Sequence, residues 1–224
     1  MAGTRIAFKS NGGTTDGYLA TPESGSGPGV IVIQEWWGLV DHIKDLADRL
    51  AGEGFVTLAP DLYHGQRTTD PDEAAKMMMA LNIAQTEKDL RGAVDFLLGQ
   101  SLASSRVGII GFCMGGQLAL FAACQNPQIG ACVDFYGIHP NVKPDYGKLS
   151  GPVLAFFGEK DHSNPPEARK GVEDGIKAAG KSIEMHVYPA DHAFFNDTRP
   201  EVYDAAAATD TWKRALDFFH KNLG

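Results

Sequence analysis

The fold of this chain is decided by residues 107–121, which read Val-Gly-Ile-Ile-Gly-Phe-Cys-Met-Gly-Gly-Gln-Leu-Ala-Leu-Phe. The stretch begins with an apolar strand pattern and ends with an apolar helix pattern. Between the two, Gly111 and Gly115 flank Cys113 in the order Gly-x-Cys-x-Gly. A sharp turn from strand to helix needs small residues at those two positions, and it presents the central side chain at a helix N-terminus, where the helix dipole favours a thiolate. The alternative is a tight turn that holds a buried structural cysteine, and the flanking strand and helix favour the first interpretation.

Outward from this stretch, short apolar runs alternate with segments of helical spacing. The runs are nearly continuous, as in parallel strands that are buried on both faces; they are Val30–Ile33, Phe55–Ala59, Val107–Ile110, Ala131–Phe135, Val153–Phe157 and Ile183–Tyr188. Arg5–Phe8 and Asp16–Ala20 flank Asn11-Gly12-Gly13, which predicts an opening hairpin. We therefore expect an α/β fold over residues 1–224, a single domain with a mostly parallel sheet and helices on both faces.

Three helices are predicted from apolar residues spaced three and four apart. The first contains Ile43, Leu46, Ala47, Leu50 and Ala51, with Asp41 as its cap. The second contains Leu90, Ala93, Val94, Leu97 and Leu98, and Thr86 with Asp89 resembles a capping box before it. The third contains Trp212, Ala215, Leu216 and Phe219, and Pro200 is its expected start.

Composition excludes several classes of function. The chain has 224 residues, 43% hydrophobic and 21% charged, with 20 basic against 28 acidic side chains and a net charge of −8. The absence of a basic cluster argues against nucleic acid or an anionic membrane surface as partner, and no apolar run approaches a membrane span or an export signal. Three cysteines cannot all pair, so we expect a reducing cytoplasm and a free thiol. Cys124 and Cys132 are expected in the core.

The stretch around Cys113 resembles the nucleophile elbow of α/β-hydrolases, with cysteine in place of serine. In that fold an acid and then a histidine follow the nucleophile along the chain, each after a strand. Asp161 follows the run 153–157 and His192 follows the run 183–188, so both are expected at the same sheet edge as Cys113. The competing histidines fall within predicted elements (His42, His186, His220), where surface or packing roles are expected, or in loops (His64, His139, His162), where solvation is expected. Asp191 is expected to serve its turn and Asp134 to be a satisfied buried carboxylate. No metal-ligand spacing is present among these histidines, so no metal is expected. Attack by a thiol with a histidine and an acid requires no organic cofactor, and none is expected.

Two further groups follow from the same elbow. The backbone N–H of Met114 and that of Trp36, after the run 30–33, are the candidate oxyanion donors. Glu35 would then lie beside the thiol. Because a carboxylate alone raises the pKa of a neighbouring thiol, Glu35 must accept a proton or be displaced when substrate binds. The alternative is a strand-end residue that bonds the backbone.

Taken together, these segments resemble the dienelactone hydrolase (carboxymethylenebutenolidase-like) family over nearly the whole chain. The shared segments are Gln34–Gly38, Ala59–Tyr63, Gly111–Gly116, Phe135–Gly137, Gly158–Asp161 and the residues around His192. The resemblance implies a Cys113–His192–Asp161 triad, oxyanion donors at Met114 and Trp36, and activation of the thiol by Glu35. It also implies an arginine four residues past the histidine, to hold a substrate carboxylate, but this chain has Asn196 there. A second substrate arginine has no counterpart within Glu73–Ala80; Arg67 could substitute or be a solvated surface residue.

The expected function is hydrolysis of lactones or short esters through a thioester acyl-enzyme on Cys113. Trp37, Tyr63, Tyr136 and Phe194, together with Trp36, could line the pocket or pack in the core. The alternatives are a general carboxylesterase or thioesterase without lactone preference, a non-catalytic ligand-binding protein on a hydrolase scaffold, and a thiol-redox protein, although no resolving cysteine lies near Cys113. The only partner expected is a small lactone or ester, and the sequence leaves the oligomeric state open.

Overall fold

The central element is one eight-stranded sheet with the order β1-β2-β4-β3-β5-β6-β7-β8. The computed structural model describes residues 2–10, 12–100 and 102–224. The strands are β1 (Thr4–Ser10), β2 (Gly13–Ala20), β3 (Gly27–Ile33), β4 (Val56–Pro60), β5 (Leu102–Phe112), β6 (Ile129–Phe135), β7 (Val153–Gly158) and β8 (Ile183–Tyr188). β1 pairs antiparallel with β2, and β2 with β4, while β4, β3, β5, β6, β7 and β8 run parallel. The predicted α/β class with a mostly parallel sheet is confirmed.

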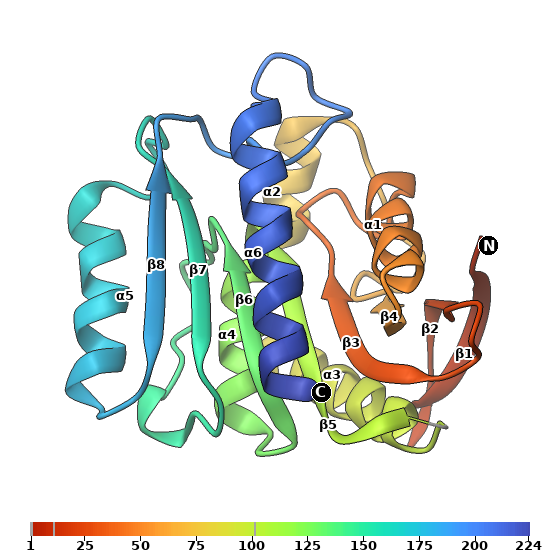
Figure 1. Ribbon diagram of the computed structural model, residues 1–224. Coiled ribbons are helices and arrows are strands. Elements are labelled where there is room, and N and C mark those ends of the chain that lie inside the picture. The colour runs from red at the N-terminus through yellow and green to blue at the C-terminus, as the bar shows by residue number, and fades with distance from the viewer. Residues whose placement is uncertain (1, 11, 101) are drawn as a thin grey trace.

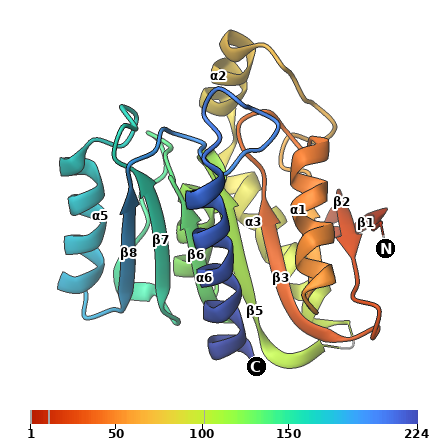
Figure 2. The ribbon, with the colours of Figure 1, turned by 45° about the horizontal axis from the view of Figure 1, so that its top comes forward.

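Helices cover both faces of the sheet (Figures 1 and 2). They are α1 (Asp41–Gly52), α2 (Pro71–Ala80), α3 (Ile83–Leu98), α4 (Met114–Gln125), α5 (Pro166–Ala178) and α6 (Ala205–Leu223), with a short 3-10 turn at Tyr146–Lys148. α1 and α6 bury their apolar residues against one face, and α3, α4 and α5 bury theirs against the other. No helix in the described ranges combines the length and apolarity that a membrane crossing needs.

The two cores explain why the strand pattern is continuous rather than alternating. Val30 and Val32 of β3 face the core with α1 and α6, while Ile31 and Ile33 face the opposite core. Each of these four side chains is fully buried. β8 differs because it is an edge strand with a half-exposed pattern. The expectation of burial on both faces is therefore wrong for Ile183–Tyr188, which has a neighbour on one side only.

The predicted helix starts need correction. Val40, not Asp41, is the N-cap of α1, and no side chain caps this helix. α3 begins earlier than expected, because Asn82 accepts from the backbone N–H of Gln85. The cap of α6 is Asp204, whose carboxylate accepts from Ala206 and Ala207, so Pro200 lies in the preceding loop. In each case a nearby residue of suitable backbone conformation occupies the cap.

The expected capping box of Thr86 and Asp89 has a different structural role. Both residues lie inside α3, where the Thr86 hydroxyl donates to the carbonyl of Asn82. Asp89 is fully buried and accepts from the hydroxyls of Ser10 and Thr15 in the opening hairpin. Asp89 therefore fastens the hairpin to α3. The predicted hairpin residue Asn11 lies outside the described residues.

Candidate active site

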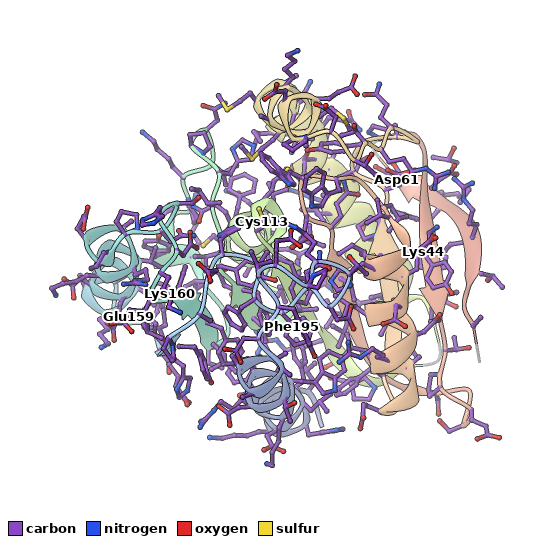
Figure 3. All side chains as sticks on the ribbon, turned by 90° about the horizontal axis from the view of Figure 1, so that it is seen from above. Lys44, Asp61, Cys113, Glu159, Lys160 and Phe195 are labelled. Atoms are coloured by element: carbon purple, nitrogen blue, oxygen red, sulfur yellow. The ribbon has the colours of Figure 1, made fainter. Side chains whose placement is uncertain are left out.

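The turn at Cys113 joins β5 directly to α4 at the carboxyl edge of the sheet. Cys113 has φ 54° and ψ −122°, a conformation that side-chain-bearing residues rarely adopt. A Cβ atom on Gly111 would lie 1.9 Å from the carbonyl oxygen of Gly115, so β5 and α4 approach because residue 111 is glycine. A Cβ atom on Gly115 would lie 2.4 Å from the carbonyl oxygen of Gln34, so glycine at 115 lets α4 approach the end of β3. Seen from above this edge, Cys113 lies near the middle of the molecule, at the end of α4 (Figure 3). The geometry is that of the predicted elbow.

Neighbouring strands hold the elbow in place. The N–H of Cys113 donates to the carbonyl of Phe135 at 3.0 Å, and the carbonyl of Cys113 accepts from Gly116 and Ile138 at 2.9 and 3.2 Å. Tyr136, next along, also has a positive φ of 43°. Unfavourable backbone conformations persist where surrounding bonds determine them, and they cluster at active sites.

His192 and Asp161 meet at this edge, as the sequence predicts. The loops after β7 and β8 bring the Nδ1 atom of His192 to 2.6 Å from Oδ2 of Asp161. Because a carboxylate only accepts, Nδ1 carries the hydrogen, and the other side of the ring interacts with Cys113. Burial lowers the pKa of His192, but the hydrogen bonds to Asp161 and Cys113 outweigh it and raise this pKa to about 10.

Asp161 is a well-satisfied carboxylate. It accepts from the backbone N–H of Ser163 at 2.8 Å and from the side-chain amide of Asn164 at 3.0 Å, in addition to His192. Burial opposes ionisation, but these hydrogen bonds lower the pKa of Asp161 below its ordinary value. The Asn164 amide also donates to the carbonyl of Tyr136, which links the acid loop to the residue after β6. Sequence reasoning did not find Asn164.

Glu35 is the second buried carboxylate of the site, and it follows β3. Its side chain is 1% exposed and accepts one hydrogen bond, at 2.8 Å, from the amide of Asn196. Burial raises the pKa of Glu35. Burial raises the pKa of Tyr136 well above its ordinary value, and Glu35 and Cys113 add to this effect. Asn196 therefore contacts Glu35 at the position where the family resemblance implies an arginine.

The two candidate oxyanion donors lie on different segments, Met114 at the start of α4 and Trp36 after β3. Met114 is the first residue of α4, so its amide proton has no acceptor within the helix. Trp36 lies in the loop after β3, and its ring meets that of Trp37 edge to face at 5.1 Å. Both tryptophans are half-buried.

Of the other predicted pocket residues, Tyr63, Tyr136 and Phe194 are buried and Arg67 is exposed. Tyr63 is buried and donates its hydroxyl to the sulfur of Met114 at 3.2 Å, next to the elbow. Tyr136 is fully buried, with its ring 5.0 Å from that of His192. Phe194 is also fully buried and packs on Tyr136 and Tyr188, so it is a core residue rather than a wall of the pocket. Arg67 is exposed beside Gly38.

A cavity of about 370 Å³ lies next to the Glu35 side of the site, and its wall includes Trp37, His42, Asn196 and Arg199. The Arg199 guanidinium lies 5.9 Å from the centre of the Trp37 ring. Arg199 and the buried His42 were not among the predicted site residues, because a loop arginine and a helical histidine carry no local signal. His139, expected in solvent, is also buried, with Nε2 3.1 Å from the carbonyl oxygen of Met78.

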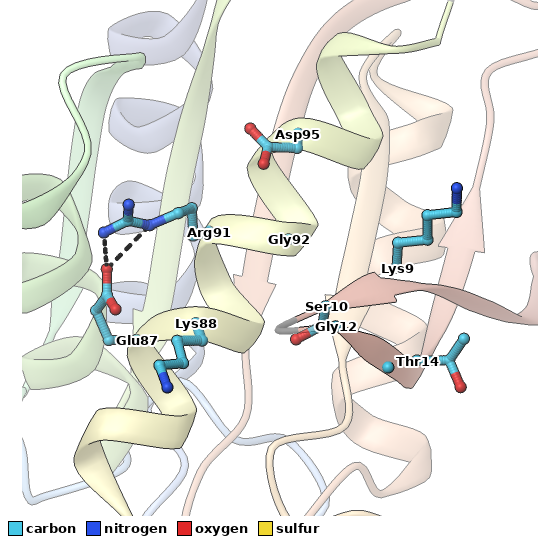
Figure 4. Close-up of a pocket in the computed structure, with 10 residues that line it drawn as sticks. Lys9, Ser10, Gly12, Thr14, Glu87, Lys88, Arg91, Gly92 and Asp95 are labelled. Atoms are coloured by element: carbon cyan, nitrogen blue, oxygen red, sulfur yellow. Dashed lines mark hydrogen bonds and ion pairs between the residues drawn. The ribbon is translucent and has the colours of Figure 1, made fainter.

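A larger cavity of about 820 Å³ lies away from this edge, between the opening hairpin and α3 (Figure 4). Its wall is formed by the ends of β1 and β2 and by side chains such as Lys88 and Arg91, the latter paired with Glu87. Among the described residues that line it there is no cysteine or histidine. In the described part of the chain, no three His, Cys, Asp or Glu side chains are arranged to hold a metal ion.

The two remaining thiols are core residues, as predicted. Cys124 and Cys132 are 3% and 1% exposed, and all three cysteines are free. Burial raises the pKa of Cys124 to about 12 and that of Cys132 well above its ordinary value. Asp134 is buried and accepts from the N–H of Gly137 at 2.8 Å, as expected of a satisfied carboxylate; burial raises its pKa to about 7.

The parallel sheet, the elbow after β5 and the acid and histidine after later strands define an α/β-hydrolase. The chain also matches the model of the Dienelactone hydrolase family over residues 15–223. It therefore belongs to that family, whose members are hydrolases of ester and lactone bonds.

Individual members of the family align with this chain over nearly its full length. The chain is 37% identical to "Protein usf" of Aquifex pyrophilus and 33% identical to a protein of Aquifex aeolicus named "Putative carboxymethylenebutenolidase", and each alignment covers 99% of both chains. Among solved structures, the "Putative Dienelactone Hydrolase" of Klebsiella pneumoniae superimposes with a TM-score of 0.89 at 33% identity, covering 97% of this chain and 98% of the other.

Proposed function

We propose that this protein is a cysteine-dependent hydrolase of lactones or short carboxylic esters, and that Cys113 attacks the carbonyl carbon to form a thioester. The observation that carries the proposal is the convergence of the strained Cys113 turn, His192 and Asp161 at one sheet edge. A reducing, cytoplasmic setting is part of the proposal, because it keeps Cys113 as a thiol.

The first half of the reaction begins with the thiol, ionised Glu35 and protonated His192. The hydrogen bond at 2.6 Å between Nδ1 of His192 and Asp161, whose pKa is lowered, supports an imidazolium in this state. Glu35 accepts the thiol proton, and Sγ of Cys113 then bonds to the carbonyl carbon. The backbone N–H groups of Met114 and Trp36 stabilise the oxyanion. As the carbon–oxygen bond breaks, His192 gives its proton to the leaving alkoxide.

The second half restores the starting state. Neutral His192, oriented by Asp161, takes a proton from water as the hydroxide adds to the thioester. The carbon–sulfur bond breaks, the acid leaves, and Cys113 recovers its proton from Glu35. The alternative role of Glu35, as a strand-end residue that only supports structure, differs in one respect: ionisation of Glu35 would then have no effect on turnover.

The substrate class is proposed to be neutral as well as anionic. Asn196 occupies the position of the arginine that the family resemblance implies, and Arg67 is exposed. A missing charge-assisted contact removes roughly 1.5–3 kcal/mol of preference for a carboxylate. We therefore expect kcat/KM for dienelactone to lie within about tenfold of that for a neutral lactone. The measurement compares kcat/KM for dienelactone, a neutral lactone and a p-nitrophenyl ester. A preference above about a thousandfold for dienelactone would contradict this substrate assignment.

Substitution of Cys113 tests the chemistry. Cys113→Ala is expected to lower turnover by at least about 10³-fold, with folding checked by circular dichroism. Cys124→Ala is the matched control, since it removes a buried thiol away from the elbow, and its turnover should stay close to that of the unmodified protein. Retained turnover in Cys113→Ala would refute the proposal and favour another nucleophile.

Trapping the intermediate separates this proposal from a binding or redox role. With a slow ester, mass spectrometry of the intact protein should show one added acyl group, which peptide mapping should place on Cys113. A non-catalytic ligand-binding protein would show no covalent adduct. A thiol-redox protein would show a disulfide or an oxidised sulfur in place of the acyl group.

A further inference from the structure

The first turn of α5 contains a buried arginine. Arg169 is 7% exposed, and its guanidinium donates a hydrogen bond to the carbonyl oxygen of Gly158, the last residue of β7. Between these two residues lies the acid loop, residues 159–165, which carries Asp161. Because Gly158 precedes this loop and Arg169 follows it, the side chain of Arg169 joins the two ends of the acid loop.

Packing alone does not explain an arginine at this position. Arg169, Val172 and Ile176 form the inward-facing stripe of α5, at helical spacings of three and four residues. An apolar side chain at the first of these positions would fill the same space without the cost of burying a charged group. Among the described residues, no carboxylate forms an ion pair with Arg169. The carbonyl of Gly158 is therefore the acceptor that compensates for its burial.

Gly158 lies where the acid loop meets the residues that lead to His192. A Cβ atom on Gly158 would lie 2.4 Å from the carbonyl oxygen of Ala190, so the backbone two residues before His192 packs directly on Gly158. The same carbonyl of Ala190 accepts from the N–H of Lys160 at 3.0 Å. Seen from above, Lys160 lies beside α5 (Figure 3). The end of β7 thus sets the separation between the acid loop and the histidine.

The carboxylate of Asp161 is held largely by its own loop. The backbone N–H groups of Ser163 and Asn164 and the Asn164 amide all donate to it. These hydrogen bonds fix the carboxylate within the acid loop, but they do not fix the loop itself. The carbonyl of Gly158 also accepts from the N–H of Asp161, at the long distance of 3.4 Å, and such a bond holds the start of the loop weakly. The place of the loop therefore depends on the contacts at its ends.

We propose that Arg169 is a positioning residue, whose guanidinium holds the two ends of the acid loop together and thereby places the carboxylate of Asp161 against Nδ1 of His192. The proposal rests on the function proposed above, in which Asp161 orients the imidazole. These two side chains lie 2.6 Å apart, and a misplacement of about 1 Å at such a contact costs about 10²-fold in rate. Arg169 acts through the backbone of Gly158.

Substitution of Arg169 tests the proposal through kcat. Arg169→Met keeps an apolar stem and removes the donor, so kcat should fall by roughly 10–10²-fold while KM changes by less than about threefold. Arg106→Met is the matched control, because the Arg106 guanidinium also donates to backbone carbonyls, those of Ile129 and Ser150, at the amino ends of β6 and β7. Its kcat should stay close to that of the unmodified protein. Equal kcat values for the two folded variants overturn the proposal, as does a loss confined to KM.

Proton NMR separates positioning from general destabilisation. The Nδ1 proton of His192, in its hydrogen bond to Asp161, should give a low-field resonance in the unmodified protein. In folded Arg169→Met this resonance should broaden or move upfield, because the carboxylate is no longer held against the ring. In Arg106→Met it should be unchanged. A low-field resonance that is the same in Arg169→Met as in the unmodified protein overturns the proposal.

The unmodified protein gives a measurement that does not depend on the variants folding. The Nη1 protons of Arg169 should exchange with solvent more slowly than the guanidinium protons of Arg5, whose side chain is 71% exposed. Equal exchange rates would show that the hydrogen bond to Gly158 is not maintained, which overturns the proposal. Failure of the proposed function is separate: it appears as turnover that survives in Cys113→Ala. Failure of the Arg169 proposal appears as Cys113-dependent turnover whose kcat is unchanged in Arg169→Met.

Discussion

The site contains two buried carboxylates, and their surroundings drive them in opposite directions. Asp161 accepts hydrogen bonds from His192, Asn164 and Ser163, and its pKa is lowered. Glu35 is buried to a similar degree, but within the described part of the chain its carboxylate accepts only from the amide of Asn196, and its pKa is raised. Burial alone therefore does not set the charge of a carboxylate; the number and charge of its donors decide.

This difference matches two kinds of role. A group that orients an imidazolium must remain ionised throughout the reaction, and Asp161 has the donors to do so. A group that accepts and returns a proton works best when its pKa lies closer to the working pH, and burial moves Glu35 in that direction. The pair follows the general rule that groups with pKa values pushed apart divide the acid and base tasks between them.

The largest effect is expected at Asp161. Asp161→Asn should lower kcat by about 10³–10⁴-fold, because His192 loses the acceptor that fixes its orientation and stabilises its charge. The basic limb of the pH profile should also move to lower pH, since the hydrogen bond to Asp161 raises the pKa of His192. Steady-state kinetics over pH give both quantities. Asp191→Asn is the control, because Asp191 is exposed, and equal losses in both variants would contradict the assigned acid.

The next effect concerns Glu35, and activity and stability should respond in opposite senses. Glu35→Gln should lower kcat/KM by about 10²-fold or more if Glu35 accepts the thiol proton. The same substitution should raise the melting temperature at neutral pH, because it removes a buried group that ionises at a cost. A variant with full activity would establish the structural role instead.

The raised pKa of Glu35 and the lowered pKa of Asp161 make the folding stability depend on pH in opposite directions. The folded pKa of Glu35 lies above its ordinary value of 4.5, so its contribution is most favourable below that value and is lost as the pH rises through the folded pKa. The gain from Glu35→Gln should therefore grow as the pH rises from about 4. Asp161 has the opposite sign: its contribution is present above its ordinary pKa and is lost as the pH falls through the lowered one. Thermal melts of both variants between acidic and neutral pH measure these trends, and parallel trends would break the contrast.

A smaller effect is expected from the amide at Glu35. Asn196→Ala removes the hydrogen bond that the Asn196 amide donates to this carboxylate, so the pKa of Glu35 should rise. The acid limb of kcat/KM should move to higher pH by about half a unit to one unit. Asn196→Asp is the sharper companion, because a second carboxylate should move the limb further in the same direction. A limb that moves to lower pH would contradict the assignment of the acid limb to Glu35.

The smallest effect is expected from the corresponding amide at Asp161. Asn164→Ala leaves Asp161 with His192 and the backbone N–H groups of residues 163 and 164 as donors. The loss of one neutral amide donor is worth about 1 kcal/mol, or about fivefold in kcat. Kinetics at the plateau pH measure it, and a loss as large as that of Asp161→Asn would show that Asn164 has a separate role through the carbonyl of Tyr136.

The sequence was most informative where the chemistry depends on spacing within a short segment. The elbow could be predicted because Gly111, Cys113 and Gly115 must follow a strand and precede a helix within a few residues. Asp161 and His192 could be predicted because parallel strands end at one edge. Helix caps were less predictable, because several residues near each helix start can cap it, and local conformation selects among them.

The sequence by itself determined the α/β class, the order along the chain of the candidate nucleophile, acid and histidine, and the two core cysteines, because each depends on local patterns and strand order. Only the tertiary structure decided the environment of Glu35. Its amide partner Asn196 lies 161 residues away, and His42 and Arg199 reach its surroundings from α1 and the last loop. Such contacts depend on how the loops after β3 and β8 pack together, and no local pattern encodes that packing. The charge on Glu35 is therefore a property of the folded chain.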